Sequence, residues 1–258
     1  MRKFLFQCLV SDNPPKPQVN KLLAALPTSD YERLIPHLKL VPLPTRQVLY
    51  EPGEPITHIY FPQHAVVSIV TSMKDGSTVE VGIVSNEGMV GIPVILGGNT
   101  TTTKAFVQVA GAGMQMDAEV LRTEFKRGGA IQNLLLRYLR AIYTELTQSC
   151  ACNRLHTLEE RLARWLLTVS DRLESEEFPL TQEFIAQMLG VRRSGVTVAA
   201  SSLSRAAMIS YQRGQINILN RKDLEATSCE CYRVIQKEFV RLLGNQPKRV
   251  GVARRRHR

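Results

Sequence analysis

The chain has 258 residues, of which 44% are hydrophobic and 22% charged, a composition typical of a globular protein with one large or two modest domains. The longest weakly polar run, residues 83–98, is interrupted by Asn86 and Glu87 and is too short to cross a bilayer. The N-terminus has no clear signal-peptide core or cleavage site, so we expect a cytoplasmic protein without a membrane partner.

The formal net charge of +10 is unevenly distributed along the chain. Residues 245–258 hold six cations and no acid, and without them the net charge falls to +4. We therefore interpret this tail as a separate basic arm, suited either to a polyanion such as nucleic acid or simply to solubility.

Residues 1–20 contain three prolines and are predicted to form a flexible leader. Short helices are expected over 20–26 and 29–38, the second one capped by Ser29. They open a predicted sensor domain over residues 21–128.

Short apolar runs separated by recurring prolines and glycines fill residues 41–121. Val79, Val81 and Ile83 alternate with less apolar residues, as in a half-buried strand, and Asp75-Gly76 is a strong hairpin signal. Many short strands with regular turns indicate an antiparallel β-barrel or jelly roll.

A long helical pattern follows over residues 129–156, which we predict to be a dimerisation helix. A partner helix from a second subunit would bury its apolar stripe, as in a short coiled coil; alternatively, the helix packs wholly within its own chain. The candidate dimer residues are Leu135, Tyr138, Leu139, Ile142 and Leu146.

Residues 157–228 carry the pattern of a winged helix-turn-helix domain, whose first element is a helix over 158–173. Thr181 is placed to cap a helix over 182–189, and Gly190 allows the positive φ of a tight turn. A second helix over 192–207 has a buried stripe, and a hairpin with Arg213-Gly214 at its turn forms the wing. The stripe consists of Val196, Ala199, Ala200 and Leu203. The fold class is thus α+β.

The second helix of such a motif presents its N-terminal residues to the major groove of DNA. Arginine there pairs with guanine, while serine and threonine reach bases or phosphates. The alternative is an ordinary helical hairpin with a solvated basic face. The candidate DNA-binding residues are Thr181, Gln182, Arg192, Arg193, Ser194, Thr197, Ser201, Gln212 and Arg213.

This arrangement resembles the Crp/Fnr superfamily of bacterial transcription regulators over residues 20–228, most specifically in the stretch QEFIAQMLGVRRSGVT. The resemblance implies a homodimer that binds double-stranded DNA and contacts RNA polymerase. Of the family's three base-reading positions, Arg193 keeps the arginine, whereas Ser194 replaces a glutamate and Val198 replaces an arginine. A half-site different from the usual family operator is therefore expected.

The family's nucleotide-binding members hold ribose with a carboxylate and the cyclic phosphate with an arginine. The corresponding stretches here contain Gly88, Met89 and Gly91, then Thr103 and Lys104, with neither group in place. We therefore expect this effector pocket not to bind cyclic AMP, although Lys104 can pair with an anion as a point charge. The effector stays unknown, and an effector-independent regulator controlled by its abundance is the alternative.

We expect no iron–sulfur cluster, because only Cys8 lies near the N-terminus, and no haem, because the five histidines are scattered. The odd number of cysteines without a CxxC pair fits a reducing compartment. Cys150 and Cys152 are interpreted as small packed residues, with oxidation sensing as the alternative; Cys229 and Cys231 open a last helix through Leu243 and are interpreted likewise. No metal site is expected.

An enzyme or small-molecule-binding protein with an incidental helix pair is a further alternative. The sequence lacks HExxH, GxSxG and GxxxxGK[ST], and we expect no enzyme. The last predicted segment, residues 229–258, is the C-terminal helix with the basic tail.

Overall fold

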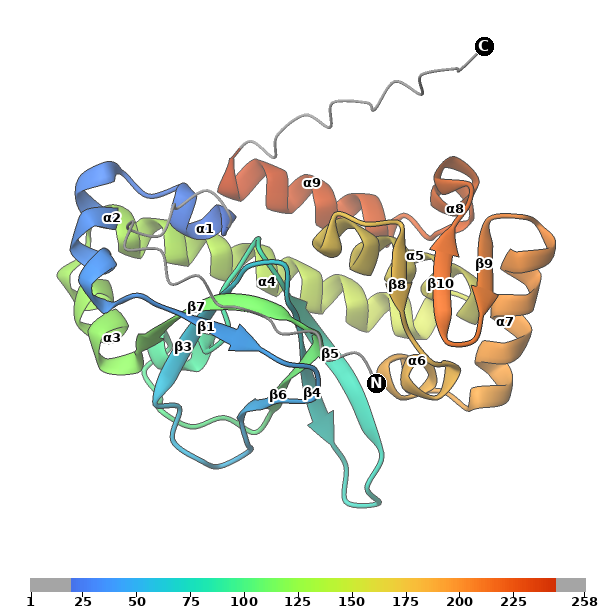
Figure 1. Ribbon diagram of the computed structural model, residues 1–258, viewed down its shortest axis with the longest axis horizontal. Coiled ribbons are helices and arrows are strands. Elements are labelled where there is room, and N and C mark those ends of the chain that lie inside the picture. Colours follow the sequence, from blue (N-terminus) through green and yellow to red (C-terminus); the bar gives the residue numbers. More distant parts are fainter. Residues whose placement is uncertain (1–19, 245–258) are drawn as a thin grey trace, which may run out of the picture.

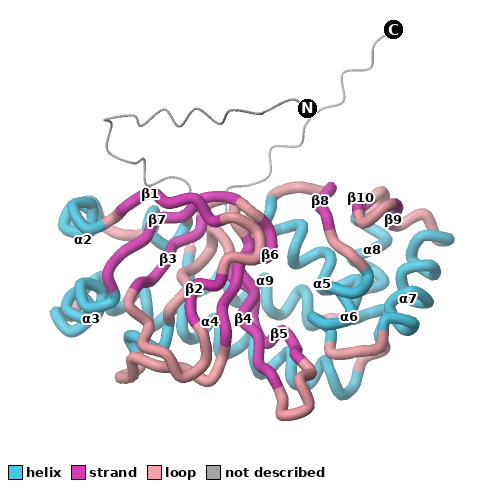
Figure 2. Tube along the Cα trace, turned by 60° about the horizontal axis from the view of Figure 1, so that its bottom comes forward, coloured by secondary structure: helices cyan, strands magenta, loops and turns pink. Residues whose placement is uncertain are grey.

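The computed structural model describes residues 20–244, which form a β-rich part and a helical part joined by one long helix (Figures 1 and 2). The leader, Cys8 and the basic tail fall outside the described residues, apart from Asn20. Within 20–244, none of the helices combines the length and apolar character needed to cross a membrane.

The chain enters the fold through α1 (Lys21–Ala24), α2 (Thr28–Leu34) and the 3-10 helix η2 (Ile35–His37). Asn20 belongs to the folded domain rather than to the leader, because its buried side chain caps α1 and donates to the carbonyls of Pro62 and Gly88. The predicted Ser29 cap is wrong: Ser29 lies inside α2, whose N-cap is Pro27, a residue without a side-chain acceptor. Its fixed φ suits it to a helix start instead.

Two antiparallel sheets form the β-rich part and share one hydrophobic core, confirming the predicted barrel or jelly roll (Figure 1). One sheet has the order β1-β7-β3 and the other β2-β6-β4-β5. The strands are β1 (Lys39–Leu43), β2 (Val48–Tyr50), β3 (His58–Pro62), β4 (Val66–Ser72), β5 (Thr78–Val84), β6 (Lys104–Val109) and β7 (Gly111–Asp117).

The predicted hairpin joins β4 to β5, with Ser72 paired to Thr78. Gly76 has a φ of +83°, and the Asp75 carboxylate accepts hydrogen bonds from the backbone N–H and hydroxyl of Ser77. These are the conformations and short-range bonds for which glycine and aspartate are favoured in turns.

Two short helices of the β-rich part were not predicted: the 3-10 helix η3 (Ile92–Ile95) and helix α3 (Ala118–Arg127). Helix α3 follows β7 without a loop, because Asp117 ends the strand and caps the helix by accepting from the N–H of Glu119.

The long helix α4 (Gly129–Leu155) confirms the predicted helix, but its buried face differs from the expected dimer face. Leu135 and Tyr138 are buried in their own chain's core, so they are corrected from dimer contacts to core residues. Leu139 and Ile142 are half-buried against the same core, whereas Leu146 is exposed. The barrel and α9 of the same chain pack against the side of the helix that holds these residues.

The helical part contains three antiparallel strands in the order β8-β10-β9, and its two central helices are joined by the predicted turn. Thr157 and Glu160 form a capping box at the start of the first helix, α5. The elements are α5 (Leu158–Leu173), β8 (Glu177–Pro179), α6 (Gln182–Leu189), α7 (Arg193–Arg205), β9 (Ile209–Gln212), β10 (Gln215–Ile218), α8 (Arg221–Thr227) and α9 (Cys231–Leu243). The last helix lies along α4 (Figure 1).

A second hydrophobic core joins the barrel to the helical part. Val66, Val70 and Ile83 of β4 and β5 pack with residues of α5 and α6, and Phe106 meets Phe184 edge to face at 6.2 Å. The barrel therefore contacts the helix-turn-helix directly, in addition to the covalent connection through α4.

Candidate DNA-binding surface, effector loop and cysteine cluster

Helices α6 and α7 meet through the turn that the sequence indicates. Thr181 accepts a hydrogen bond from the N–H of Phe184, and Gly190 ends α6 with a φ of +64°. The stripe of α7 that packs inward is the predicted one: Val196, Ala199, Ala200 and Leu203 are all buried. This packing fixes which side of α7 faces solvent.

The outward side of α7 and the adjoining wing carry the predicted DNA-binding residues. Arg192 is the N-cap of α7 rather than its first residue. Thr197 donates to the Gln182 side chain at 2.8 Å, which ties the exposed faces of the two helices together. The exposed candidates are Thr181, Arg192, Arg193, Ser194, Thr197, Ser201, Gln212 and Arg213, with Gln182 half-buried.

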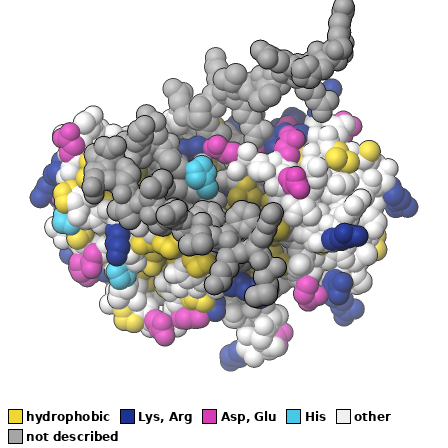
Figure 3. All heavy atoms as spheres, viewed as in Figure 1, with side chains coloured by type: hydrophobic (Ala, Val, Ile, Leu, Met, Phe, Trp, Pro, Cys, Tyr) yellow, Lys and Arg dark blue, Asp and Glu magenta, His cyan; other side chains and the backbone are white. Residues whose placement is uncertain are grey.

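The wing is the tight hairpin between β9 and β10, with Gln212 paired to Gln215. Arg213 and Gly214 both have positive φ, 51° and 77°, as the primed turn of a two-residue hairpin requires. Lys and Arg side chains project from the end of the molecule at which α7 and the wing lie (Figure 3). This end carries the charge expected of a phosphate-facing surface.

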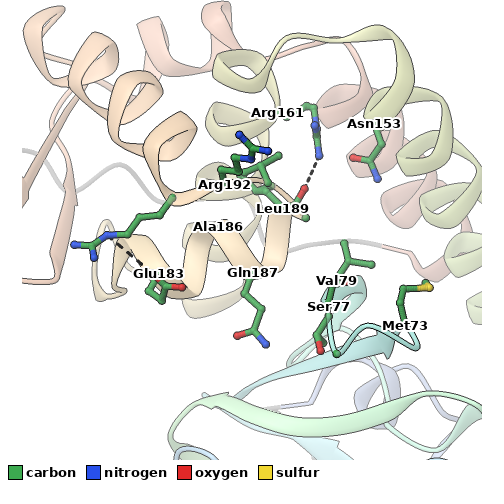
Figure 4. Close-up of a pocket in the computed structure, with 15 residues that line it drawn as sticks. Met73, Ser77, Val79, Asn153, Arg161, Glu183, Ala186, Gln187, Leu189 and Arg192 are labelled. Atoms are coloured by element: carbon green, nitrogen blue, oxygen red, sulfur yellow. Dashed lines mark hydrogen bonds and ion pairs between the residues drawn. The ribbon is translucent and has the colours of Figure 1, made fainter.

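A groove of about 1190 Å³ separates the helix-turn-helix from the β4–β5 hairpin (Figure 4). Gln187 points from α6 towards the hairpin that carries Ser77 and Val79. At the α6–α7 turn the approach is close, since a Cβ on Gly190 would lie 3.0 Å from a methyl carbon of Val79. The hairpin thus limits how far the turn can move towards the barrel.

Arginine side chains border the same groove. Arg161 of α5 donates to the carbonyl of Leu189 at 2.7 Å, at the end of α6. Arg193 forms an exposed ion pair with Glu183 at 4.0 Å, whereas Arg192 lines the groove beside it. Because exposed pairs of this kind contribute little, the Arg193 guanidinium is available to another partner.

The predicted effector residues separate into two places. Gly88, Met89 and Gly91 lie in a loop that packs on α4, where the Tyr138 hydroxyl accepts from the N–H of Met89 at 3.1 Å. A Cβ on Gly88 would lie 2.0 Å from that hydroxyl, so only glycine fits. Burial raises the pKa of Tyr138. This loop is held by the long helix rather than open to a ligand at these atoms.

The second place is the start of β6. The Lys104 ammonium pairs with the Glu51 carboxylate at 2.7 Å, and the Thr103 N–H donates to the Thr101 hydroxyl. Lys104, which was expected to pair with an anion, therefore already has a partner in the carboxylate of Glu51, the residue after β2.

Sequence analysis did not find a buried ionic cluster beside the effector loop. The Arg172 guanidinium of α5 lies 3.1 Å from a carboxylate oxygen of Glu87 and 3.1 Å from one of Glu145 on α4. All three side chains are buried. Ser85 of the same loop donates to the backbone carbonyl of Arg172 at 3.0 Å. The loop is thereby attached to the helix that begins the DNA-binding domain.

Sequence analysis also missed a cluster of thiols and imidazole at the end of α4. The structure brings Cys152, His156, Cys229 and Cys231 together, with their ligand atoms all within 4.8 Å of one another. Cys150, in contrast, is exposed and lies apart from them. The available signal was the spacing of Cys152 and His156, four residues apart on one helix face, together with the CxC of Cys229 and Cys231.

Two models of known families match the chain. The Crp-like helix-turn-helix domain matches residues 160–227, and the cyclic nucleotide-binding domain matches residues 40–127. A Crp-like winged helix-turn-helix beside a cyclic nucleotide-binding-like barrel defines a DNA-binding transcription regulator, not an enzyme. Together the two matches take in more than half of the chain, which belongs to the Crp/Fnr superfamily of transcription regulators.

Solved structures of this fold are similar at low identity. A Crp/Fnr-family putative regulator from Eubacterium rectale is 16% identical, with a TM-score of 0.64 over 80% of this chain and 96% of that one. FixK2 from Bradyrhizobium japonicum is 17% identical, with a TM-score of 0.64 over 74% and 98%. The c-di-GMP-responsive regulator CLP from Xanthomonas campestris is 16% identical, with a TM-score of 0.62 over 74% and 99%. No curated protein matches the chain.

Proposed function

We propose that the chain is a homodimeric, sequence-specific regulator that reads a non-standard half-site and does not respond to cyclic AMP. The observation that supports this most is the exposed face of α7, whose first turn carries Arg192, Arg193 and Ser194 next to the wing. A recognition helix meets base edges with this end. We also propose that the DNA-bound dimer acts in the reducing cytoplasm and contacts RNA polymerase.

Arg193 is the residue best placed for direct base reading. It stands on the first turn of α7, it is exposed, and its contact with Glu183 is long and weak. Ser194 and Val198, both exposed, occupy the other two reading positions and offer a hydroxyl and an apolar surface instead of charges. The apolar Val198 fits contact with a thymine methyl group.

A selection of bound duplexes from a random library tests this function. The wild-type chain should enrich one motif, and Arg193→Ala should weaken binding to it by about 1–3 kcal/mol and relax one position. Arg205→Ala removes the same charge from the far end of α7 and should keep the motif. Equal enrichment of all sequences by the wild-type chain at moderate salt refutes the proposal.

The dimer proposal is supported by a stripe on α4 that its own chain leaves uncovered. Leu136, Tyr143 and Leu146 are exposed, Leu139 is half-buried, and Cys150 continues the same spacing. Steps of three and four residues are those of a two-helix seam. Dimerisation over this seam would set two recognition helices about 34 Å apart, one turn of DNA.

Sedimentation of two matched variants tests the dimer. Leu146→Glu puts a charge into the seam and should shift the wild-type dimer to monomer. Leu155→Glu changes another exposed leucine of α4, outside the stripe, and should leave the dimer intact. A monomeric wild-type chain, or equal effects of the two variants, contradicts the proposal.

The absence of a cyclic AMP response is proposed because the residues at the pocket do not fit the nucleotide. Lys104 is engaged by Glu51, and the Gly88–Met89 loop is packed against Tyr138. We likewise propose no haem or iron–sulfur cluster. Titration calorimetry with cyclic AMP should give no binding heat, and saturable binding would refute this part; binding of a different metabolite would exclude control by abundance alone.

A further inference from the structure

We propose that Cys152, His156, Cys229 and Cys231 form a tetrahedral zinc site that fixes the junction between the long helix and the DNA-binding domain. This inference stands on the geometry of these four side chains and is independent of the proposed DNA preference. It replaces the sequence-based expectation of small packed cysteines and of no metal.

The four ligand atoms lie within 4.8 Å of one another, and two of their separations are close to those around a tetrahedral ion. Cys152 Sγ lies 3.5 Å from Cys229 Sγ, and Cys231 Sγ lies 3.5 Å from His156 Nδ1. Zinc–sulfur bonds of about 2.3 Å and zinc–nitrogen bonds of about 2.0 Å separate tetrahedral ligands by about 3.8 Å and about 3.5 Å. The four groups are therefore already spaced for coordination, with small adjustments.

Two separate parts of the fold supply the ligands. Cys152 lies in the last turn of α4 and His156 is the residue that ends it, so both point to one side of the helix end. Cys229 lies in the turn after α8, and Cys231 is the first residue of α9. Packing of α9 against α4 brings the two pairs together.

The surroundings of the cluster match those of a metal ligand sphere. The ring nitrogen of His156 that faces away from the thiols, Nε2, lies 3.3 Å from the Glu230 carboxylate. A carboxylate in this position orients a ligating imidazole and raises its basicity. Gln148 donates an N–H to Cys231 Sγ at 3.2 Å, as in hydrogen-bonded thiolates.

The charge balance also favours a divalent ion. Three thiolates and a neutral imidazole around Zn²⁺ carry a net charge of −1, and the positive charge of Arg164 acts on Cys152. The three cysteines are buried, and binding would release the proton of each thiol without any redox change. Soft sulfur ligands with one imidazole select zinc over calcium or magnesium.

Four protein ligands leave no open position, so the site is structural rather than catalytic. It would join the end of α4 to the α8–α9 turn at the point where the chain passes through Thr157 into α5. A structural ion there restricts the hinge between the dimer helix and the recognition helix.

Metal analysis of the untagged full-length chain, purified under reducing conditions, tests the site. We expect one zinc per chain, and Co²⁺ in its place should give the intense visible bands of a tetrahedral thiolate site. Cys229→Ser should lower zinc affinity at least 100-fold in a chelator competition. Glu230→Gln, which disturbs only the histidine's partner, should lower it about 10-fold.

Cys150→Ser is the matched control, because it removes an exposed cysteine of the same helix and should leave one zinc bound. The wild-type chain itself provides a readout that does not depend on variant folding: a strong chelator should expose three further thiols to a thiol reagent. Absence of zinc and cobalt binding by the reduced wild-type chain overturns the proposal, as does a Cys152–Cys229 disulfide in place of metal. Equal binding by Cys229→Ser also overturns it.

Discussion

Replacing Glu80 with glutamine should stabilise the folded chain by up to about 3 kcal/mol at pH 8 but by less than about 1 kcal/mol at pH 5. Glu80 of β5 accepts a hydrogen bond from the Trp165 indole at 2.7 Å, and its other oxygen is buried. Burial raises the pKa of this carboxyl to about 7, despite the Trp165 hydrogen bond that lowers it. Part of the Glu80 side chain is exposed, but one carboxylate oxygen is buried, and the loss of water around that oxygen disfavours the charged form.

The sign and size of the effect follow from linkage. The unfolded carboxyl loses its proton near pH 4.5 and the folded one near pH 7, so the folded state is destabilised as pH rises between these values. At 1.36 kcal/mol per pKa unit, the loss at pH 8 reaches at most about 3 kcal/mol. Glutamine keeps an acceptor for Trp165 and has no proton to lose, so the loss disappears.

Urea unfolding at several pH values measures this difference. Fluorescence of Trp165, the chain's single tryptophan, and circular dichroism should report the same transition, at one protein concentration because a dimer unfolds in a concentration-dependent way. Glu54→Gln removes an exposed carboxylate and should run parallel to the wild-type curve. Parallel curves for wild type and Glu80→Gln from pH 5 to 8 would refute the reasoning.

Arg172→Met should destabilise the chain by about 3–5 kcal/mol, measured by urea unfolding, because it leaves two buried carboxylates without their cation; a loss below 1 kcal/mol contradicts the buried pairing. Gly88→Ala should cost about 1–3 kcal/mol through its clash with the ring and hydroxyl of Tyr138, and combining it with Tyr138→Ala, which removes both, should cost less than the sum of the two changes. Additive costs would show that the clash is relieved elsewhere. Removing residues 245–258 should flatten the salt dependence of non-specific DNA binding, and an unchanged slope excludes the tail from the complex.

The helix-turn-helix could be predicted closely because its signals are local. The Thr181 cap, the Gly190 turn and the spacing of the buried α7 stripe lie within one short segment, and each sets a backbone conformation by itself. The wing turn at Arg213-Gly214 follows the same logic. Local chemistry is sufficient where the structure is decided over a few residues.

Predictions failed where partners come from distant parts of the chain. The apolar stripe of α4 marks a face to be covered but does not say by what, and the chain's own barrel and α9, rather than a second subunit, share the core that buries Leu135 and Tyr138. Cys152 and Cys229 are 77 residues apart, so their contact depends on the packing of α9 on α4. Tertiary packing decides both cases, and neither hydrophobic period nor cysteine count encodes it.

The loop at residues 85–91 of the barrel is bound to helix α5 of the DNA-binding domain. A displacement of this loop is therefore difficult to confine to the barrel. Glu87 stands next to Gly88, which Tyr138 of α4 confines, and its carboxylate is paired with Arg172 of α5. Any displacement of the loop must move this buried charge with its partner or separate the two. Because separating buried charges costs several kcal/mol, the favoured response is a joint shift of loop and α5, which carries α6 and α7 with it. Residues 85–91 are thus joined to α5 by two contacts, the Ser85 hydrogen bond to the Arg172 carbonyl and the Glu87–Arg172 ion pair.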